Sequence, residues 1–371
     1  MNNVARAIIP TWGTIDIASV VRRPPAPPTW PDTISSTLRA MSKQPGRHNQ
    51  NGGSGQSSLP ELSIQLSNFS DVDAGGWQPL FDLVRAADRA GVDRVVVSDH
   101  IAFGERLDAY GDPASGGTAG GRQPTGPDGH WLEPMTLLSV LAGMTTNVRL
   151  GTAILLAALR RPAVLAKQAA TLDVLSGGRL DLGVGIGWQR EEYEVAGLDF
   201  ARRGALLDHC LAVCQTLWTN QVAAFSDAEL SFDRIHAMPK PLQRGGVPIW
   251  VSGRINPRTV DRMVRFGTGW IPWGEHVGDP LPGIETIRSA FRLAGRDPAG
   301  LRVQGTLPVV RTDGVIDLAA TMAAVPNLFD AGITDFRFYN RWSADPESTA
   351  ELLTAAVDAF RTTVGRPRHA T

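Results

Sequence analysis

The amino-acid sequence predicts an α/β fold in which one (β/α)8 barrel of the TIM type forms most of the chain. Two observations lead to this prediction. Eight short segments have the apolar, β-branched character of strands, and most of them are separated by stretches with helical spacing of apolar residues. Strands that alternate with helices form parallel sheets, and eight such units within about 310 residues favour a closed barrel over an open doubly wound sheet.

The predicted strands are short and differ in pattern. Residues 62–66 alternate between apolar and polar side chains, whereas residues 95–97 form a valine run typical of a strand buried on both faces. The other predicted strands are residues 148–154, 180–185, 248–252, 270–273, 303–310 and 334–338. Helices with clear spacing are predicted at residues 77–90, 135–144, 162–175 and 347–363.

The first 58 residues differ in composition from the rest. Four prolines between residues 24 and 28 are followed by a polar, glycine-rich run at residues 44–58, which cannot bury enough apolar surface to order itself. We expect residues 1–58 to form a disordered N-terminal extension and residues 59–366 to form the barrel domain. Met41 is a candidate for the true start of the protein.

Composition and charge exclude several classes of protein. The formal net charge of −1 gives no field that attracts nucleic acid or an anionic membrane, and no apolar run approaches the roughly eighteen residues of a spanning helix. No secretory signal is recognisable, so a cytoplasmic location is expected. Cys210 and Cys214 lie four residues apart in a helical pattern, and no nearby cluster completes a metal site. We expect both thiols to pack in the interior and no metal to be bound.

In a barrel of this kind, the site is built at the carboxyl ends of the strands. Glycines and aromatic residues dominate those ends here, which suits a flat conjugated ligand. The strand ends contain Ser98-Asp99-His100, Thr152-Ala153-Ile154, Gly185-Ile186-Gly187-Trp188 and Ser252-Gly253-Arg254. Two long insertions, residues 104–130 and 223–247, are expected as loops at this face, and the first is a candidate lid.

The same strand ends lack the groups that other barrel chemistries need. A metallohydrolase needs paired histidines or carboxylates at the first strand end, and Asn68-Phe69-Ser70 supplies none. No lysine lies at a strand end for a Schiff base, and no Gly-x-Ser-x-Gly elbow precedes a helix.

Individual residues leave two interpretations open. Gly185 and Gly187 fit either tight strand packing or a phosphate turn. Ser252-Gly253-Arg254 precedes a helix that begins near Asn256, where backbone N–H groups and the Arg254 side chain can bind a phosphate. His100, with Asp99 before it, is either a proton donor or acceptor or a buried structural histidine. Trp188 is either core or cofactor wall.

Several motifs resemble the luciferase-like monooxygenases, and in particular their actinobacterial branch that uses coenzyme F420. These are residues 91–100 (GVDRVVVSDH), 148–154 (VRLGTAI), 175–188 (LSGGRLDLGVGIGW), 238–241 (MPKP) and 248–253 (PIWVSG). The motifs occur in the family's order, and the resemblance as a whole covers roughly residues 62–360. The resemblance implies a luciferase-like TIM barrel that binds a deazaflavin or flavin.

The resemblance also implies roles for residues. A non-proline cis peptide between Ala153 and Ile154, after Thr152, would lie under the cofactor ring. His100 and Asp99 would serve proton transfer. Cofactor contacts would come from Gly185, Gly187, Trp188, Ser252, Gly253 and Arg254. A sugar-phosphate dehydrogenase of the family carries a catalytic Glu where Trp188 stands, so this departure predicts a more apolar pocket.

The function expected from the resemblance is F420-dependent hydride transfer to or from a small, fairly apolar organic substrate. Two alternatives stay open at this point. One is an FMN-dependent monooxygenase, which would need a separate flavin reductase as partner, and the other is a non-catalytic flavin-binding protein. The resemblance also allows a homodimer, although no surface for it can be named from the sequence.

Overall fold

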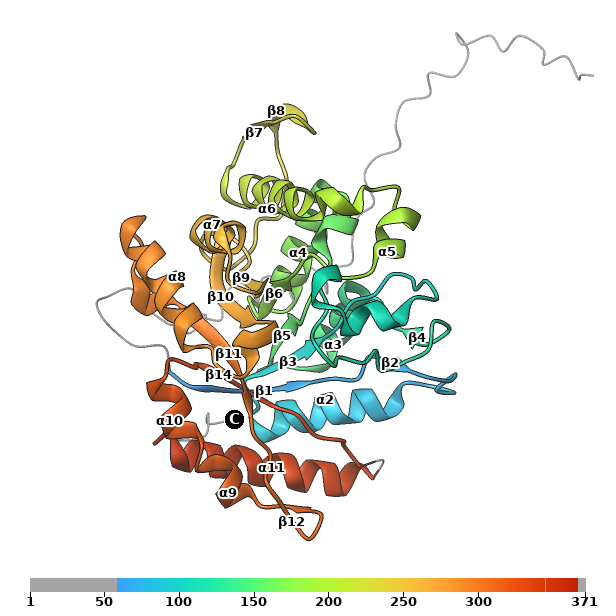
Figure 1. Cartoon of the computed structure of the whole chain (residues 1–371), viewed down its shortest axis with the longest axis vertical. Helices are drawn as coiled ribbons and strands as arrows, with labels where there is room; N and C mark the ends of the chain where they lie inside the picture. The colour runs from blue at the N-terminus through green and yellow to red at the C-terminus, as the bar shows by residue number, and fades with distance from the viewer. Residues whose placement is uncertain (1–58, 344, 366–371) are drawn as a thin grey trace, which may run out of the picture. The chain divides into compact units, whose positions relative to one another are not determined.

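The computed structural model describes residues 59–343 and 345–365, so the expected disordered extension at residues 1–58 lies outside the described part. Eight parallel strands close into a barrel surrounded by helices, as predicted (Figure 1). In order around the barrel the strands are β1 (Glu61–Gln65), β3 (Arg94–Val97), β5 (Arg149–Thr152), β6 (Leu180–Val184), β9 (Ile249–Gly253), β10 (Gly267–Pro272), β11 (Arg302–Leu307) and β14 (Asp335–Phe338).

Helices cover the outside of the barrel. The larger ones are α2 (Gln78–Ala90), α3 (Pro134–Met144), α4 (Pro162–Leu175), α6 (Arg203–Thr219), α7 (Pro257–Phe266), α8 (Leu281–Leu293) and α11 (Pro346–Thr363). Short helices α5 (Arg190–Val195), α9 (Leu318–Met322) and α10 (Val325–Asp330) lie in the connections. Many begin with a proline in the first turn, where its missing N–H costs nothing, and Gly91 ends α2 with a left-handed φ of 86°.

The predicted strand limits differ from the structure by more than one residue at three places, the first being β11, which ends at Leu307 and not at residue 310. Strand β5 ends at Thr152, and the chain then bulges so that only Leu155 rejoins β6, by a single bridge to Val184. Strand β10 begins at Gly267, earlier than predicted, because the apolar pattern misses its first residues. A Cβ on Gly269 would lie 2.3 Å from the Trp250 ring, so the glycine makes room for that indole.

The long insertions contain structure of their own. Residues 104–131 carry two 3-10 turns and end in β4 (His130–Trp131), which pairs with β2 (Phe69–Ser70). The second insertion forms the antiparallel pair β7 (Ala223–Ser226) and β8 (Ser231–Ile235). Cys210 and Cys214 are buried in α6 as free thiols. No helix in the described ranges is long and apolar enough to cross a membrane.

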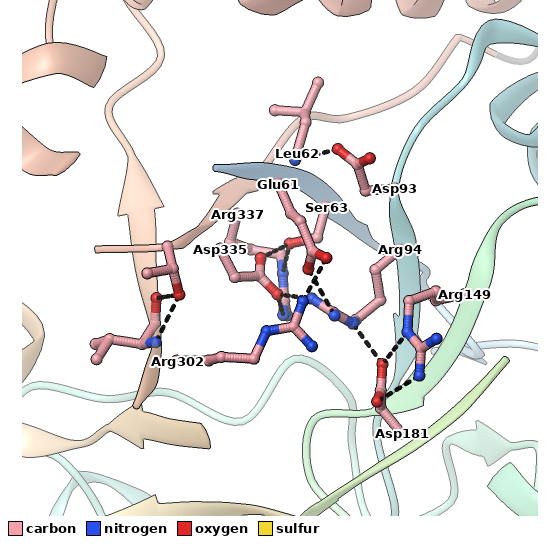
Figure 2. A network of polar contacts seen from close by, with 12 residues as sticks. Glu61, Leu62, Ser63, Asp93, Arg94, Arg149, Asp181, Arg302, Asp335 and Arg337 are labelled. Atoms are coloured by element: carbon pink, nitrogen blue, oxygen red, sulfur yellow. Dashed lines mark hydrogen bonds and ion pairs between the residues drawn. The ribbon is translucent and has the colours of Figure 1, made fainter. Parts of the chain in front are cut away.

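The amino ends of the strands hold a buried ion network in place of the branched apolar layers usual in such barrels (Figure 2). Arg94 lies at its centre and contacts Glu61, Asp181 and Asp335. Burial alone would raise the pKa of Asp181, but the guanidinium groups of Arg149 and Arg94 hold that pKa well below its usual range. The network ties together strands that are far apart in the sequence.

Candidate functional site

A cavity of about 550 Å³ opens at the carboxyl ends of the strands. Its size is in the range typical of small-molecule sites. Seven residues proposed from the sequence line it together: Ala153, Ile154, Gly185, Gly187, Trp188, Ser252 and Gly253. His100 and Asp99 also reach its wall. The structure therefore brings most of the predicted site residues to one place, although their roles differ in ways that the sequence did not indicate.

The wall formed by β5 and β6 depends on two glycines. The Ala153–Ile154 peptide is cis, as the resemblance implied. A Cβ on Gly185 would lie 2.0 Å from Ile154 Cδ1, and a Cβ on Gly183 would lie 2.0 Å from the Thr152 carbonyl oxygen. Close packing of the two strands thus requires Gly183, whereas at Gly185 a side chain would displace the flexible end of Ile154. Gly185 also lines the cavity, so its role in strand packing is compatible with a place in the candidate site.

Thr152 serves strand packing and is not in the cavity wall. Its side chain is buried, and its hydroxyl donates to the Gly183 carbonyl across 2.7 Å. The threonine therefore fixes β5 against β6 directly beneath the Ala153–Ile154 bond. Thr152 therefore directly precedes the wall residues Ala153 and Ile154 and does not itself line the cavity, although a cofactor contact was expected for it.

His100 is held by a carboxylate that the sequence analysis missed. Its Nδ1 lies 3.1 Å from Glu192 Oε2, while Glu192 Oε1 accepts a 2.9 Å hydrogen bond from the backbone N–H of Ile101. Glu192 is on α5 and fully buried. Because Nδ1 is engaged, the other ring nitrogen of His100 is left for the cavity. This is the geometry of an oriented proton donor or acceptor.

Aromatic rings surround the imidazole of His100. Phe103 lies 4.4 Å from it between ring centroids, Trp131 lies 4.8 Å away edge-on, and Trp188 lies 5.9 Å away. The side chain of His100 retains only 11% exposure. The same aromatic wall includes Tyr110, whose pKa is raised by burial and by nearby Tyr339. Trp188 is therefore a wall residue of the cavity and presents an apolar face to it.

Asp99 faces away from the histidine that follows it. Its carboxylate receives two hydrogen bonds from Arg160, at 2.6 and 3.1 Å, and a third from the backbone N–H of Leu156. The carboxylate is completely buried. The structure thus places Asp99 in an ion pair that fastens the β5–α4 connection, while Glu192 takes the position beside His100 that the sequence suggested for Asp99.

The guanidinium of Arg254 contacts the lid. Its Nη2 donates to the Gly117 carbonyl over 3.0 Å, its Nη1 donates to the Pro113 carbonyl, and its Nε lies 3.3 Å from a Glu275 oxygen. Trp273 Nε1 donates to the Gly116 carbonyl at 3.1 Å. Arg254 and Trp273 thus hold residues 113–117 over the cavity. The backbone of Ser252 and Gly253 remains in the cavity wall.

The functional residues missed from the sequence gave little local signal. Glu192 is one of three glutamates in α5, and only the one facing the barrel can reach His100. Arg337 lies inside β14 and also lines the cavity, although arginine is uncommon in strand interiors that face a core. No group of three or more His, Cys, Asp or Glu side chains among the described residues is arranged to hold a metal ion.

The fold is a closed parallel barrel with a cavity of small-molecule size at the carboxyl ends of its strands. The family of luciferase-like monooxygenases matches residues 61–371, and the chain belongs to that family. The predicted family and fold are thereby confirmed, and members of the family are oxidoreductases or monooxygenases.

Relatives with similar sequences include two mycobacterial proteins. Uncharacterized protein Rv0940c of Mycobacterium tuberculosis (strain ATCC 25618 / H37Rv) is 30% identical over 261 residues, which cover 68% of this chain and 82% of that protein. The phthiodiolone/phenolphthiodiolone dimycocerosates ketoreductase of Mycobacterium kansasii is 34% identical over 230 residues, covering 61% of each.

Among solved structures, an F420-dependent secondary alcohol dehydrogenase in complex with an F420-acetone adduct has the same fold. The TM-score is 0.62 at 17% identity, and the alignment covers 82% of this chain and 99% of that one. At this identity the likeness concerns the fold alone.

The residues present fit a flat ring cofactor. Aromatic side chains and glycine backbone dominate the cavity wall, the chain bulges into it at Ala153–Ile154, and Gly187 and Gly253 expose backbone at its rim with φ of 69° and 154°. Glycine at such positions allows close approach of a ligand to the backbone. These are the properties expected of a site for an isoalloxazine or deazaisoalloxazine ring.

Proposed function

We propose that the protein is an oxidoreductase that uses coenzyme F420 for hydride transfer to or from a small organic carbonyl compound or alcohol. The observation that carries this proposal is His100, oriented by Glu192 and facing the cavity beside the Ala153–Ile154 bulge. Reduction of a carbonyl needs a hydride at carbon and a proton at oxygen. A cavity that holds a flat ring and one oriented histidine supplies both.

The protein's own residues then have defined tasks. The deazaflavin supplies two-electron hydride chemistry when bound. Its ring would be held by Ala153, Ile154, Gly185 and Gly253. His100 gives a proton to the carbonyl oxygen as the alcohol forms, or takes it from the alcohol in the reverse direction. Glu192 stabilises the imidazole of His100 while the imidazole carries the proton and is positively charged. Tyr110, Trp188 and Trp273 exclude water from the reacting atoms.

The names of two similar proteins agree with the proposed substrate class. One relative is a ketoreductase, and one structural neighbour is an F420-dependent alcohol dehydrogenase. Both names concern the interconversion of a carbonyl and an alcohol. The aromatic wall around His100, with Trp188 in it, favours a substrate whose body is largely apolar.

The first test measures binding of F420 and, separately, of FMN to the purified full chain. Quenching of the cofactor's fluorescence reports the binding. We expect micromolar or tighter binding of F420, weak binding of FMN, and oxidation of reduced F420 by a panel of ketones. His100→Asn should bind F420 as the wild type does and reduce ketones about 10²- to 10⁴-fold more slowly. Tight FMN binding without F420 binding would contradict the proposal.

The second candidate function is that of an FMN-dependent monooxygenase, which the family name supports. In that case the protein would consume oxygen only when a separate flavin reductase delivers reduced FMN. Oxygen uptake with a reductase and FMN, measured beside the F420 assay, separates the two functions. Cofactor binding without turnover in either assay would favour a flavin-binding protein with no catalytic role.

A further inference from the structure

The inner end of the cavity carries a buried guanidinium that the protein leaves short of acceptors. Arg337, the third residue of β14, is 2% exposed and lines the cavity. Its Nε donates to Ser63 Oγ at 2.7 Å. Its one ion-pair contact is long, 3.9 Å from Nη2 to Asp335 Oδ2. In residues 59–343 and 345–365, Arg337 has no other side-chain or backbone acceptor.

The carboxylate nearest to Arg337 is already engaged. Asp335 Oδ2 contacts Arg94, and Asp335 Oδ1 accepts the hydroxyl of Ser63, as Figure 2 shows. Arg337 therefore lies beside Asp335 without a direct hydrogen bond to it. A guanidinium removed from water is stabilised when an acceptor meets its N–H groups.

The charges of the network leave one positive charge uncompensated. The network joins the guanidinium groups of Arg94, Arg149, Arg302 and Arg337 to the carboxylates of Glu61, Asp181 and Asp335. Three of the arginines have short contacts with these acids. Arg337 has only the long one, and it is the member of the network that lines the cavity. The excess charge therefore faces the ligand space.

Above Arg337 the cavity changes character. Gln65 and Gln304 lie, like Arg337, on strands of the barrel, and Ser98 directly follows β3, whereas Trp131, Trp188 and Trp273 lie on segments outside the barrel strands. The part of the cavity formed by the strands is thus cationic and polar, and the part formed by the segments beyond them is aromatic. A complementary ligand has a flat or apolar body with an oxyanion at one end.

We propose that Arg337 marks an oxyanion subsite at the inner end of the cavity, which binds a carboxylate or a delocalised oxyanion on a flat small molecule. The planar guanidinium presents paired N–H groups that match such an anion. This inference rests on the proposed function, because the anion belongs either to the substrate or to the cofactor of that reaction. The source is either a carboxylate on the substrate or the anionic ring edge of the cofactor.

The test compares benzoate with benzamide, which have the same shape but differ in charge. Quenching of the intrinsic tryptophan fluorescence of the full chain reports the binding, since three tryptophans line the cavity. We expect the wild type to prefer benzoate by about tenfold or more, as a charge-assisted contact would give. Arg337→Gln should abolish the preference, while the control Arg341→Gln, at an exposed arginine, should keep it.

The same variants are then titrated with F420 and FMN to identify the source of the anion. Unchanged cofactor affinity in Arg337→Gln assigns the subsite to the substrate, and a parallel loss assigns it to the cofactor ring. A wild type without the benzoate preference, or a folded Arg337→Gln variant that keeps it, overturns the proposal. Should that variant fail to fold, Arg337→Met is measured in the same way.

The subsite and the proposed function can fail separately. A chain that binds neither F420 nor FMN but keeps an Arg337-dependent preference for benzoate retains the subsite and loses the proposed function. A chain that binds F420 and reduces ketones, yet shows no charge preference, retains the function and loses the subsite.

Discussion

At the scale of single residues, the pairing of His100 with Glu192 decides how the site can work. The two residues are 92 positions apart in the sequence, and the carboxylate is completely buried. A buried carboxylate at one ring nitrogen fixes the imidazole and stabilises its charged form during proton transfer. Glu192 is accordingly a positioning residue, since it acts on the substrate only through His100.

Glu192→Gln should lower kcat about tenfold or more while KM and the Kd for the cofactor stay near their wild-type values. The amide keeps the oxygen that accepts from Ile101 N–H, so the fold should be preserved. Steady-state kinetics and thermal melting provide the measurement, with the exposed neighbour Glu194→Gln as control. An unchanged kcat, or equal losses of kcat and cofactor binding, would contradict a positioning role.

We expect replacement of Asp99 to affect stability more than turnover, because its partners lie in the β5–α4 connection and not at His100. Asp99→Asn removes the charge that Arg160 faces in a buried pair, and loss of one partner in such a pair costs about 3–5 kcal/mol. Urea unfolding should therefore show a clearly lower free energy of unfolding. Turnover per folded molecule should change much less than in His100→Asn. A stable variant that is inactive would instead assign Asp99 to the chemistry.

At the scale of structural elements, the contact between β5 and β6 limits which glycines can be replaced. A Cβ at residue 183 would meet a backbone oxygen, whereas a Cβ at residue 185 would meet the end of a flexible isoleucine side chain. Gly183→Ala should therefore destabilise the fold by about 1–3 kcal/mol or more. Gly185→Ala should fold and change the affinity for the ring cofactor. Equal melting temperatures for the two variants would contradict this account.

The lid is another element whose behaviour follows from its contacts. Trp273→Phe keeps the ring but removes the indole N–H that donates to the carbonyl of Gly116. A hydrogen bond of this kind contributes about 1 kcal/mol, so lid opening should become about fivefold more frequent. Hydrogen exchange at residues 113–118 measures this change.

Trp342→Phe is the matched control for the lid prediction, because the Trp342 indole N–H has no acceptor among the described residues. If both variants exchange at the wild-type rate, Trp273 does not hold the lid. The lid also gives Arg254 two contacts that the sequence did not predict, since the guanidinium donates to two lid carbonyls.

At the scale of the whole molecule, the ion network couples stability to pH. The pKa of Asp181 is depressed in the folded state, against about 3.9 for an unfolded aspartate. The folded protein thus holds fewer protons than the unfolded chain below about pH 5. The stability from this group is complete above the unfolded value and is lost progressively as the pH falls below about 4.

Asp181→Asn should be less stable at pH 7 and should show a shallower fall in melting temperature between about pH 5 and 3. Asp330→Asn, at an exposed carboxylate, is the control and should follow the wild-type curve. Parallel curves for Asp181→Asn and the wild type would show that the acid lability of the protein has another origin.

The barrel, the order of its elements and the edge at which the site lies can all be predicted from the amino-acid sequence. Period-two and helical patterns are local, and glycines and His100 at strand ends fall on the correct face once the strands are parallel. Nine of the eleven site residues predicted in this way line the cavity, although they are a minority of the residues that form its wall. The resemblance also identified the Ala153–Ile154 bond, which the structure has as cis.

The partners of the charged side chains are visible only in the folded structure. Glu192 faces His100, Asp99 faces Arg160, Arg254 faces the lid and Arg337 faces the cavity. Each of these contacts joins segments that are far apart in the chain and meet when the barrel closes and the lid folds over it. Local periodicity carries no information about which of several similar charges will meet, because that depends on the packing of distant elements.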